Sequence, residues 1–462
     1  MTFLSQLSIH ADKAFLRRLF AIALPITLQS MMFSSRSLVD VLMLGQLGEA
    51  EIAAVGVAAR ATFVTTIMLV GVTTGGALLT AQYWGGLAIK LGGVRRSTAL
   101  TWMIAIMFAA IAIALFVVFP QPIMSLTTDS QEVIELGGAS YLIISSVSMF
   151  AVACVASMSV GLRAMHQPGL STFFSGIGIL SNVFLNWVLI FGQLGFPALG
   201  ITGAAIATVI SGAIEVGCLF GYLWLKKHII AFGWDDIRAG LVLDKITRFL
   251  SLSLPTTFNF LAWAGGLFAY HASWGGQAGV QGLAALSVMT PVESIALAMM
   301  IGLSNAAAVL VGNQLGARNF EPVYYQAWAT VILNVLIAFV VAVLLVVSNQ
   351  WILNAFSALT TDTRELAEQF MVILALGVVL RSVPMMAIVG VLRAGGDVKF
   401  CLYQDILAQW VIGIPLAAFA AIYLNWDPQW VYLLFLTEEV VKWAICLPRM
   451  VSRKWMKNLI GQ

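Results

Sequence analysis

The chain has 462 residues, of which 60% are hydrophobic and 10% are charged, and its mean hydropathy is +0.95. Soluble globular proteins carry roughly 25% charged residues, so this composition excludes a water-soluble fold and indicates a helical protein that crosses the membrane several times. The formal net charge of +3 says little by itself, and no nucleic-acid partner is expected.

Apolar runs separated by polar, glycine or proline breaks predict twelve transmembrane helices. In chain order they cover 19–44, 52–80, 98–119, 133–158, 170–192, 201–225, 250–274, 282–311, 325–348, 366–391, 400–424 and 430–448. The expected fold class is therefore an all-α polytopic membrane protein.

The positive charges of the loops test this count. If alternate loops are cytoplasmic, they hold 19 of the 24 Lys and Arg residues, whereas the opposite loops hold only Arg364. This asymmetry is typical of a multi-pass protein with both termini in the cytoplasm. We therefore expect a cell-membrane location (the inner membrane of a bacterium), with membrane lipids as partners.

The two halves of the chain repeat each other. The segment 162–164 (Leu-Arg-Ala) recurs at 392–394, and Pro25 and Pro255 are separated by the same interval along the chain. An even number of helices per repeat keeps both copies in the same orientation. The repeat predicts two pseudo-symmetric six-helix bundles at 1–225 and 250–462, joined by a cytoplasmic linker at 226–249.

Asp40 is the most informative residue of the first predicted helix. A carboxylate that faces lipid costs about 2.5–3.5 kcal/mol on insertion scales, so an acid here is expected to face a protein interior or a wet cavity. Arg36 lies one helical turn earlier on the same face. The pair is either a coupling site or a buried ion pair that only fixes helix packing.

Several segments resemble the multidrug and toxic compound extrusion (MATE) transporters. The segments that carry the resemblance are Pro25-Ile26-Thr27 with Asp40, and residues 182–187, 200–208, 312–317 and 391–394. The resemblance covers essentially the whole chain. It implies a monomeric transporter, not an enzyme, that exports cationic, amphipathic drug-like molecules against an inward flow of protons or sodium ions.

Carried over to this chain, the resemblance makes Asp40 the cation-coupling acid, beside the polar pair Asn182 and Asn186. DinF-like members are expected to have an aspartate at the second of these positions, where this chain has Asn186, so Asp40 is the only acid of the matched cluster. NorM-like members carry acids in the seventh and tenth helices, but here the seventh-helix position falls near Trp263 and residues 371–392 contain no acid. The cation sites are thus closer to the DinF-like pattern, which favours protons over sodium.

Other polar residues in the predicted spans remain candidates for substrate binding or secondary coupling. They are Thr208, Glu215, Glu293 and Trp263. Glu215 and Glu293 are equally compatible with packing roles. We also expect two structural ion pairs, Asp405 with Arg381 and Glu438 with Lys442.

Enzyme functions find no support in the motifs. The four histidines are scattered outside any H-E-x-x-H pair, and no Walker-type loop is present, so neither a metal nor a cofactor is expected. The alternative transporter function is a lipid-linked oligosaccharide flippase, which needs several cationic side chains to meet phosphate. Arg36, Arg60 and Arg381 keep this alternative open, and a channel or receptor is not excluded.

Overall fold

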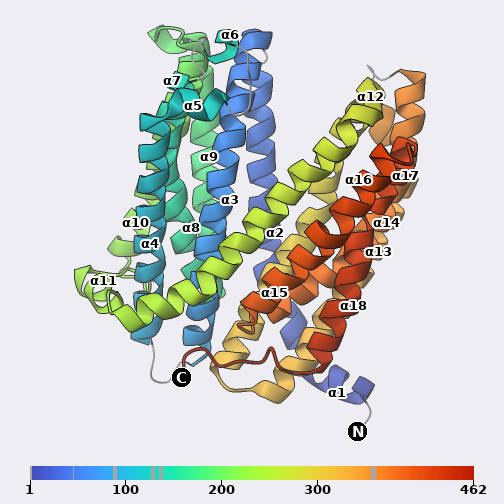
Figure 1. Cartoon of the computed structure of the whole chain (residues 1–462). Helices are drawn as coiled ribbons and strands as arrows, with labels where there is room; N and C mark the ends of the chain where they lie inside the picture. Colours follow the sequence, from blue (N-terminus) through green and yellow to red (C-terminus); the bar gives the residue numbers. More distant parts are fainter. Residues whose placement is uncertain are drawn as a thin grey trace. The chain divides into compact units, whose positions relative to one another are not determined.

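The computed structural model describes residues 3–44, 46–86, 91–125, 131–134, 139–354 and 360–461. Every regular element within these ranges is a helix (Figure 1). The predicted all-α fold class is therefore confirmed. The chain divides into two compact units, one of Leu28–Thr257 and one of Met1–Thr27 with Phe258–Gln462. The domain boundaries expected at 225 and 250 stay a prediction.

The unit Leu28–Thr257 contains the second part of α2 (Lys13–Leu44) and the first residues of α12 (Leu243–Gly316). Between them lie α3 (Glu49–Gly85), α4 (Leu91–Val118), α5 (Pro120–Ser125), α6 (Gln131–Val133), α7 (Ala139–Ser146), α8 (Ser148–Ala164), α9 (Pro168–Phe191), η2 (Gln193–Gly195), α10 (Gly200–Leu225) and α11 (Trp234–Gly240). We call it the Leu28–Thr257 unit.

The second unit, which we call the C-terminal unit, begins with α1 (Phe3–His10) and the first part of α2. It continues from Phe258 of α12 through α13 (Phe320–Asn354), α14 (Thr361–Pro384), the π-helix η3 (Met385–Leu392), α15 (Val398–Asp405), the π-helix η4 (Ile406–Gly413), α16 (Ile414–Ile422), α17 (Pro428–Leu434) and α18 (Thr437–Val451). Thus α2 changes unit after Thr27 and α12 changes unit after Thr257.

Ten helices of the described residues are long and apolar enough to cross a membrane. They overlap ten of the twelve predicted spans. The predicted seventh span lies within α12, which runs on through residues whose side chains are not described. The predicted twelfth span is interrupted between α17 and α18, and α18 has only 15 residues with four charged side chains. Its charged side chains form ion pairs within the C-terminal unit, as described below.

The stretch assigned to α12 contains two segments that both pack within the C-terminal unit, with a reversal of the chain between them. A straight helix would separate Asn259 from Ser304 by about 68 Å. Both residues nevertheless contact the same short segment, because Asn259 accepts a hydrogen bond from Arg393 at 2.7 Å and the Ser304 carbonyl lies beside Gly390. The chain therefore reverses between these two residues, as the predicted spans 250–274 and 282–311 require.

Small residues let two pairs of helices approach closely. A Cβ atom on Gly71 of α3 would lie 2.5 Å from the Thr257 Cα in α12, and one on Gly302 of α12 would lie 2.8 Å from the Ala23 carbonyl oxygen in α2. Glycines at such contacts allow backbones to pack tightly without a hydrophobic driving force from water. Each unit thus holds part of the first helix of the opposite repeat.

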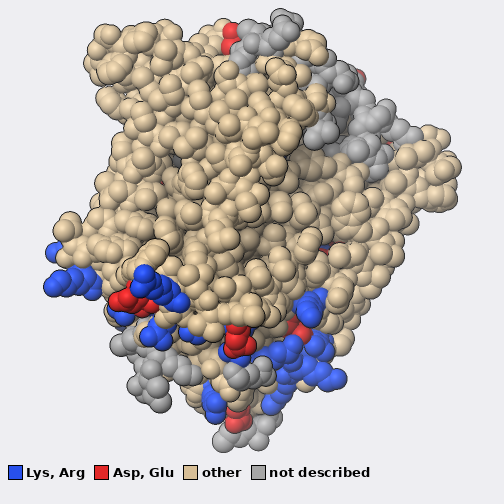
Figure 2. Space-filling model, turned by 60° about the vertical axis from the view of Figure 1, so that its left-hand side comes forward, with Lys and Arg blue, Asp and Glu red and all other residues tan. Residues whose placement is uncertain are grey.

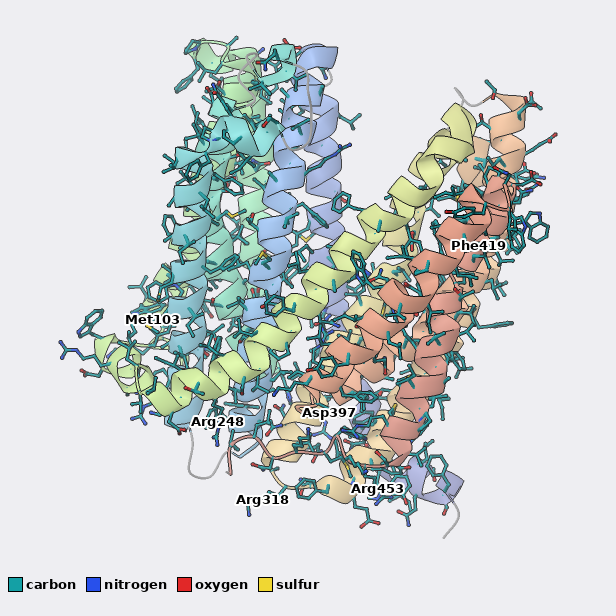
Figure 3. All side chains as sticks on the ribbon, in the orientation of Figure 1. Met103, Arg248, Arg318, Asp397, Phe419 and Arg453 are labelled. Atoms are coloured by element: carbon teal, nitrogen blue, oxygen red, sulfur yellow. The ribbon has the colours of Figure 1, made fainter. Side chains whose placement is uncertain are left out.

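The C-terminal tail packs against its own unit. The Trp455 side chain is fully buried, and the Asn458 amide donates to the Leu315 carbonyl at 2.8 Å. Asp397 accepts hydrogen bonds from Arg449 at 2.6 Å and from Lys457 at 2.8 Å. Figure 3 labels Asp397 at the same end of this unit as Arg318 and Arg453.

Two opposing effects act on the Asp397 carboxyl, which lies between helices η3 and α15, outside the membrane spans. Burial raises the pKa of Asp397, but the hydrogen bonds and charges of Arg449 and Lys457 outweigh burial and lower its pKa below the ordinary value. The ionised carboxylate therefore stabilises the folded tail at neutral pH.

The surface of the protein is largely apolar. Most of the face shown in Figure 2 is free of charged side chains, and its Lys and Arg residues occupy a limited part. Leu225, Leu180 and Trp351 are 85%, 72% and 76% exposed. Such exposure suits contact with lipid tails and not with water.

We predict that Gly71→Ala lowers stability by about 1–3 kcal/mol, because the new methyl group meets helix backbone that no rotamer change can move. The matched control is Gly217→Ala in α10, where a Cβ would meet no atom within 4 Å. Its thermal unfolding midpoint should be unchanged or slightly higher than that of wild type. Thermal unfolding of the purified protein in detergent measures both. Equal midpoints for the two variants would contradict the close contact.

Asp397→Asn is expected to lower stability by about 1–3 kcal/mol near neutral pH, because Arg449 and Lys457 lose their anionic partner. A depressed folded-state pKa gives stability that is lost as the pH falls, so the difference from wild type should shrink below about pH 4. Thermal midpoints over a pH series measure this change. Asp235→Asn, at an exposed carboxylate of α11, is the control, and a pH-independent difference would contradict the explanation.

Candidate functional site

Asp40 lies against a polar pair on α9. The Asn186 amide donates a hydrogen bond to Asp40 Oδ1 at 2.6 Å, and its nitrogen also lies 3.4 Å from Asn182 Oδ1. Asn182 and Asn186 are 0% and 1% exposed, whereas Asp40 is half-buried. The structure thus brings together the predicted coupling acid and both predicted amides.

The local sequence explains this arrangement. The helix α9 starts at Pro168, where a missing N–H costs nothing, and it ends at Gly192 in a left-handed conformation (φ 70°). Within it, Asn182 and Asn186 are four residues apart and so share one face. An ionised carboxylate can only accept hydrogen bonds, so Asn186 must turn its nitrogen toward Asp40.

The two asparagine amides do not use all their hydrogen-bonding groups within the described residues. Asn182 Nδ2 and Asn186 Oδ1 are buried and have no hydrogen-bond partner among the described residues. An unsatisfied buried polar atom costs about 1–3 kcal/mol, so it is normally met by water or a ligand. The site therefore offers one donor and one acceptor beside a carboxylate. The side chain of Arg36, predicted to pair with Asp40, lies outside the described residues.

Glu215 belongs to a second polar group in the Leu28–Thr257 unit. Its carboxylate is buried and accepts a hydrogen bond from Ser175 at 2.7 Å. The Gln29 amide donates to Ser175 at 3.0 Å and to Ser171 at 3.2 Å. A Cβ on Gly178 would lie 2.5 Å from a Glu215 carboxylate oxygen, so this glycine makes room for the acid.

Two other predicted residues, Thr208 and Trp263, show no comparable grouping among the described contacts. The Thr208 hydroxyl donates to the Ala204 carbonyl of its own helix at 3.0 Å. Trp263 is 45% exposed and lies in the C-terminal unit, not in the unit that contains Asp40. Their predicted roles in substrate binding stay predictions.

Glu293 lies in an ion-pair cluster of the C-terminal unit. Arg381 forms salt bridges with Glu293 and, at 3.4 Å, with Glu439. The expected Arg381–Asp405 pair is wrong, because the salt bridge of Asp405 runs to Lys442 at 3.8 Å. Arg381 lies closer to two other acids, on α12 and α18. The expected pairing of Glu438 with Lys442 is present at 3.5 Å.

The sequence analysis missed Asn259, which connects this cluster to Arg393. Its amide nitrogen donates to Asp405 at 2.6 Å, and its oxygen accepts from Arg393 at 2.7 Å. The repeat contains the signal that could have identified it. Gln29 and Ser175 precede Asn259 and Asp405 by the same interval that separates the repeats, and both pairs form the corresponding hydrogen bond.

Comparison with known proteins gives a consistent result. The sequence matches the MatE family over residues 25–188 and again over 255–419, two segments that start at the two repeat-related prolines. Among curated relatives, the uncharacterized transporter YisQ of Bacillus subtilis is 24% identical over 97% of this chain and 96% of its own. The probable multidrug resistance protein NorM of Mesorhizobium japonicum is 24% identical over 95% and 94%.

Solved structures share the fold. The Vibrio cholerae MATE transporter VcmN in its bent form has a TM-score of 0.84 at 18% identity and covers 98% of this chain and 100% of its own. An outward-facing multidrug resistance MATE family transporter has a TM-score of 0.84 at 16% identity, covering 95% and 96%. These matches support the expected arrangement of twelve helices in two bundles. With two matched segments that together cover most of its length, this chain belongs to the MATE family of membrane transporters.

Proposed function

We propose that the protein is a secondary active multidrug efflux antiporter that exports cationic, amphipathic compounds in exchange for protons. The observation that carries the proposal is the 2.6 Å hydrogen bond from Asn186 to Asp40, made beside the buried amide of Asn182. The relatives named as probable multidrug resistance proteins support the class of substrate.

The charge state of Asp40 supplies the coupling. An ionised Asp40 accepts the hydrogen bond of Asn186 and presents a negative charge to an organic cation. Protonation removes that charge and weakens the bond. Exchange follows if the proton and the substrate favour opposite conformations, since a ligand shifts an equilibrium only through its differential affinity.

The orientation of Asn186 favours the proton over sodium as the coupling ion. Sodium needs oxygen ligands, but Asn186 turns an N–H group toward the Asp40 carboxylate. A hydrogen-bond donor in that position occupies one carboxylate oxygen and directs hydrogen atoms, not oxygen, toward a metal ion. Sodium remains the alternative coupling ion, and the experiment below separates the two.

The flippase alternative finds less support. A lipid phosphate requires cationic side chains that are available to it, but Arg381 is already paired with Glu293 and Glu439. We further propose a monomer in the bacterial inner membrane with both termini cytoplasmic, as the distribution of Lys and Arg favours.

Asp40→Asn is expected to reduce proton-driven efflux at least about tenfold, because the asparagine keeps the shape of the side chain but cannot ionise. Proteoliposomes in which the proton and sodium gradients are collapsed separately provide the measurement. Asp12→Asn is the matched control, since Asp12 caps α2 through the Phe15 N–H at 2.8 Å and asparagine caps equally well. Undiminished efflux by Asp40→Asn would rule out this acid as the coupling group.

Asn186→Ala is expected to reduce efflux in the wild-type background but not further in the Asp40→Asn background. Two residues that act through one hydrogen bond give non-additive effects. Initial efflux rates for the two single variants and the double variant test this, with Asn319→Ala, at an exposed position, as the control. Fully additive losses would mean that Asn186 acts independently of Asp40.

A further inference from the structure

Lys442 lies at the centre of a cluster of carboxylates in the C-terminal unit. Its ammonium nitrogen is 3.8 Å from Asp405 Oδ1, 3.5 Å from Glu438 Oε1 and 4.0 Å from Glu439 Oε1. The Lys442 side chain is 9% exposed, and those of Glu438 and Glu439 are 8% and 7% exposed. One ammonium group therefore balances three acids in a nearly dry environment.

The surroundings contain more negative than positive charge. Arg381 binds Glu439 and also Glu293, so its charge is shared between two acids. Tyr270 donates a hydrogen bond to Glu438 at 3.0 Å but brings no positive charge. Asn259 lies between Asp405 and Arg393, because it donates a hydrogen bond to Asp405 and accepts one from Arg393. Counted formally, four acids face two directly bonded cations, so removal of either cation leaves a large buried excess of negative charge.

The cluster also has unmet hydrogen-bonding capacity. Asp405 Oδ1 has no hydrogen-bond partner among the described residues, because the Lys442 ammonium lies beyond hydrogen-bond distance. Arg393 is 3% exposed and its Nη1 is likewise unpartnered there. Lys442 donates a hydrogen bond to Glu438 at 3.5 Å but acts on Asp405 and Glu439 through its charge, as a bound monovalent cation would.

The other repeat has different chemistry at the equivalent place. Ser175 corresponds to Asp405 in the repeat, and Glu215 lies within one helical turn of the position that corresponds to Lys442. In the Leu28–Thr257 unit, Ser175 donates to Glu215 at 2.7 Å, so a neutral hydroxyl faces an acid. In the C-terminal unit, an acid faces a lysine. The lysine is thus a feature of one repeat and not a requirement of the fold.

We propose that Lys442 is a covalently attached counter-cation that excludes sodium from the carboxylate cluster of Asp405, Glu438 and Glu439. The side chain fills the position that a free monovalent cation would take among these oxygens. The role of Lys442 rests on the proposed function, which is exchange of substrate against protons. By occupying the cluster, Lys442 prevents sodium from binding in the C-terminal unit. Replacement of Lys442 by a neutral residue should convert the cluster into a sodium-binding site.

The test measures sodium binding by the purified full-length protein and does not depend on transport. Thermal midpoints are recorded in sodium chloride and in choline chloride at equal ionic strength and at about pH 8, where few protons compete with sodium. A ligand that binds only the folded state raises the midpoint with concentration. We expect no sodium-specific rise of the thermal midpoint for wild type and a clear rise for Lys442→Met. The apparent sodium affinity of Lys442→Met should be at least about tenfold higher than that of wild type.

Two controls separate the position from the substitution. Lys442→Arg keeps the charge and should show no sodium response. Lys457→Met makes the same change at a lysine whose partner, Asp397, lies outside the cluster, and it should also show none. An equal sodium-specific response in wild type, or none in Lys442→Met, overturns the proposal.

Lys442→Met can fail to fold because it leaves buried charge uncompensated. A second variant, Lys442→Met with Glu439→Gln, removes one acid together with the lysine. Its sodium response should exceed that of Glu439→Gln alone, and equal responses overturn the proposal. Failure of Asp40→Asn to affect efflux would refute the proposed function but leave this binding result intact, so the two failures are distinguishable.

Discussion

The energetic cost of placing a carboxylate among apolar helices governs this protein. Lipid tails and packed side chains cannot replace the hydration of a charge, so each buried acid needs a donor or a cation within reach. The two units meet this constraint differently. Among the contacts described above, Asp40 accepts a hydrogen bond from Asn186 and Glu215 accepts one from Ser175, whereas Asp405, Glu438 and Glu439 surround Lys442. A neutral donor supplies a hydrogen bond without an opposite charge, whereas the ammonium of Lys442 supplies a positive charge.

The internal repeat explains why these groups occupy comparable places. Gln29 and Asn259 are related by the same offset as their partners, Ser175 and Asp405, and each amide bridges two helices. Duplication thus conserved the position of an interhelical hydrogen bond while the neighbouring side chains diverged. Family membership fixes the helix arrangement, but the division of chemistry between the two units depends on which side chains each copy now carries.

Much of the architecture could be predicted from the sequence, because hydropathy, loop charge and repeat offsets each report a property of the chain itself. Asp40 and Asn186 were predicted to lie together only through their resemblance to family motifs, since they are 146 residues apart. The partner of Arg381 could not be predicted. Three acids on different helices lay within plausible reach, and rotation of each helix, which local sequence does not determine, selects among them. The twelfth span and the pairing of Glu438 with Lys442 were predicted, but the break between α17 and α18 was not, because hydropathy does not report a local interruption of a helix.

The helices α2 and α12 each run from one compact unit into the other, with the transitions after Thr27 and Thr257. Pro25 and Pro255 each precede such a transition by two residues. Proline lacks the N–H that would bond to the preceding turn, so a helix is most easily deformed around it. The covalent joints between the units are therefore also the places where helical backbone resists bending least.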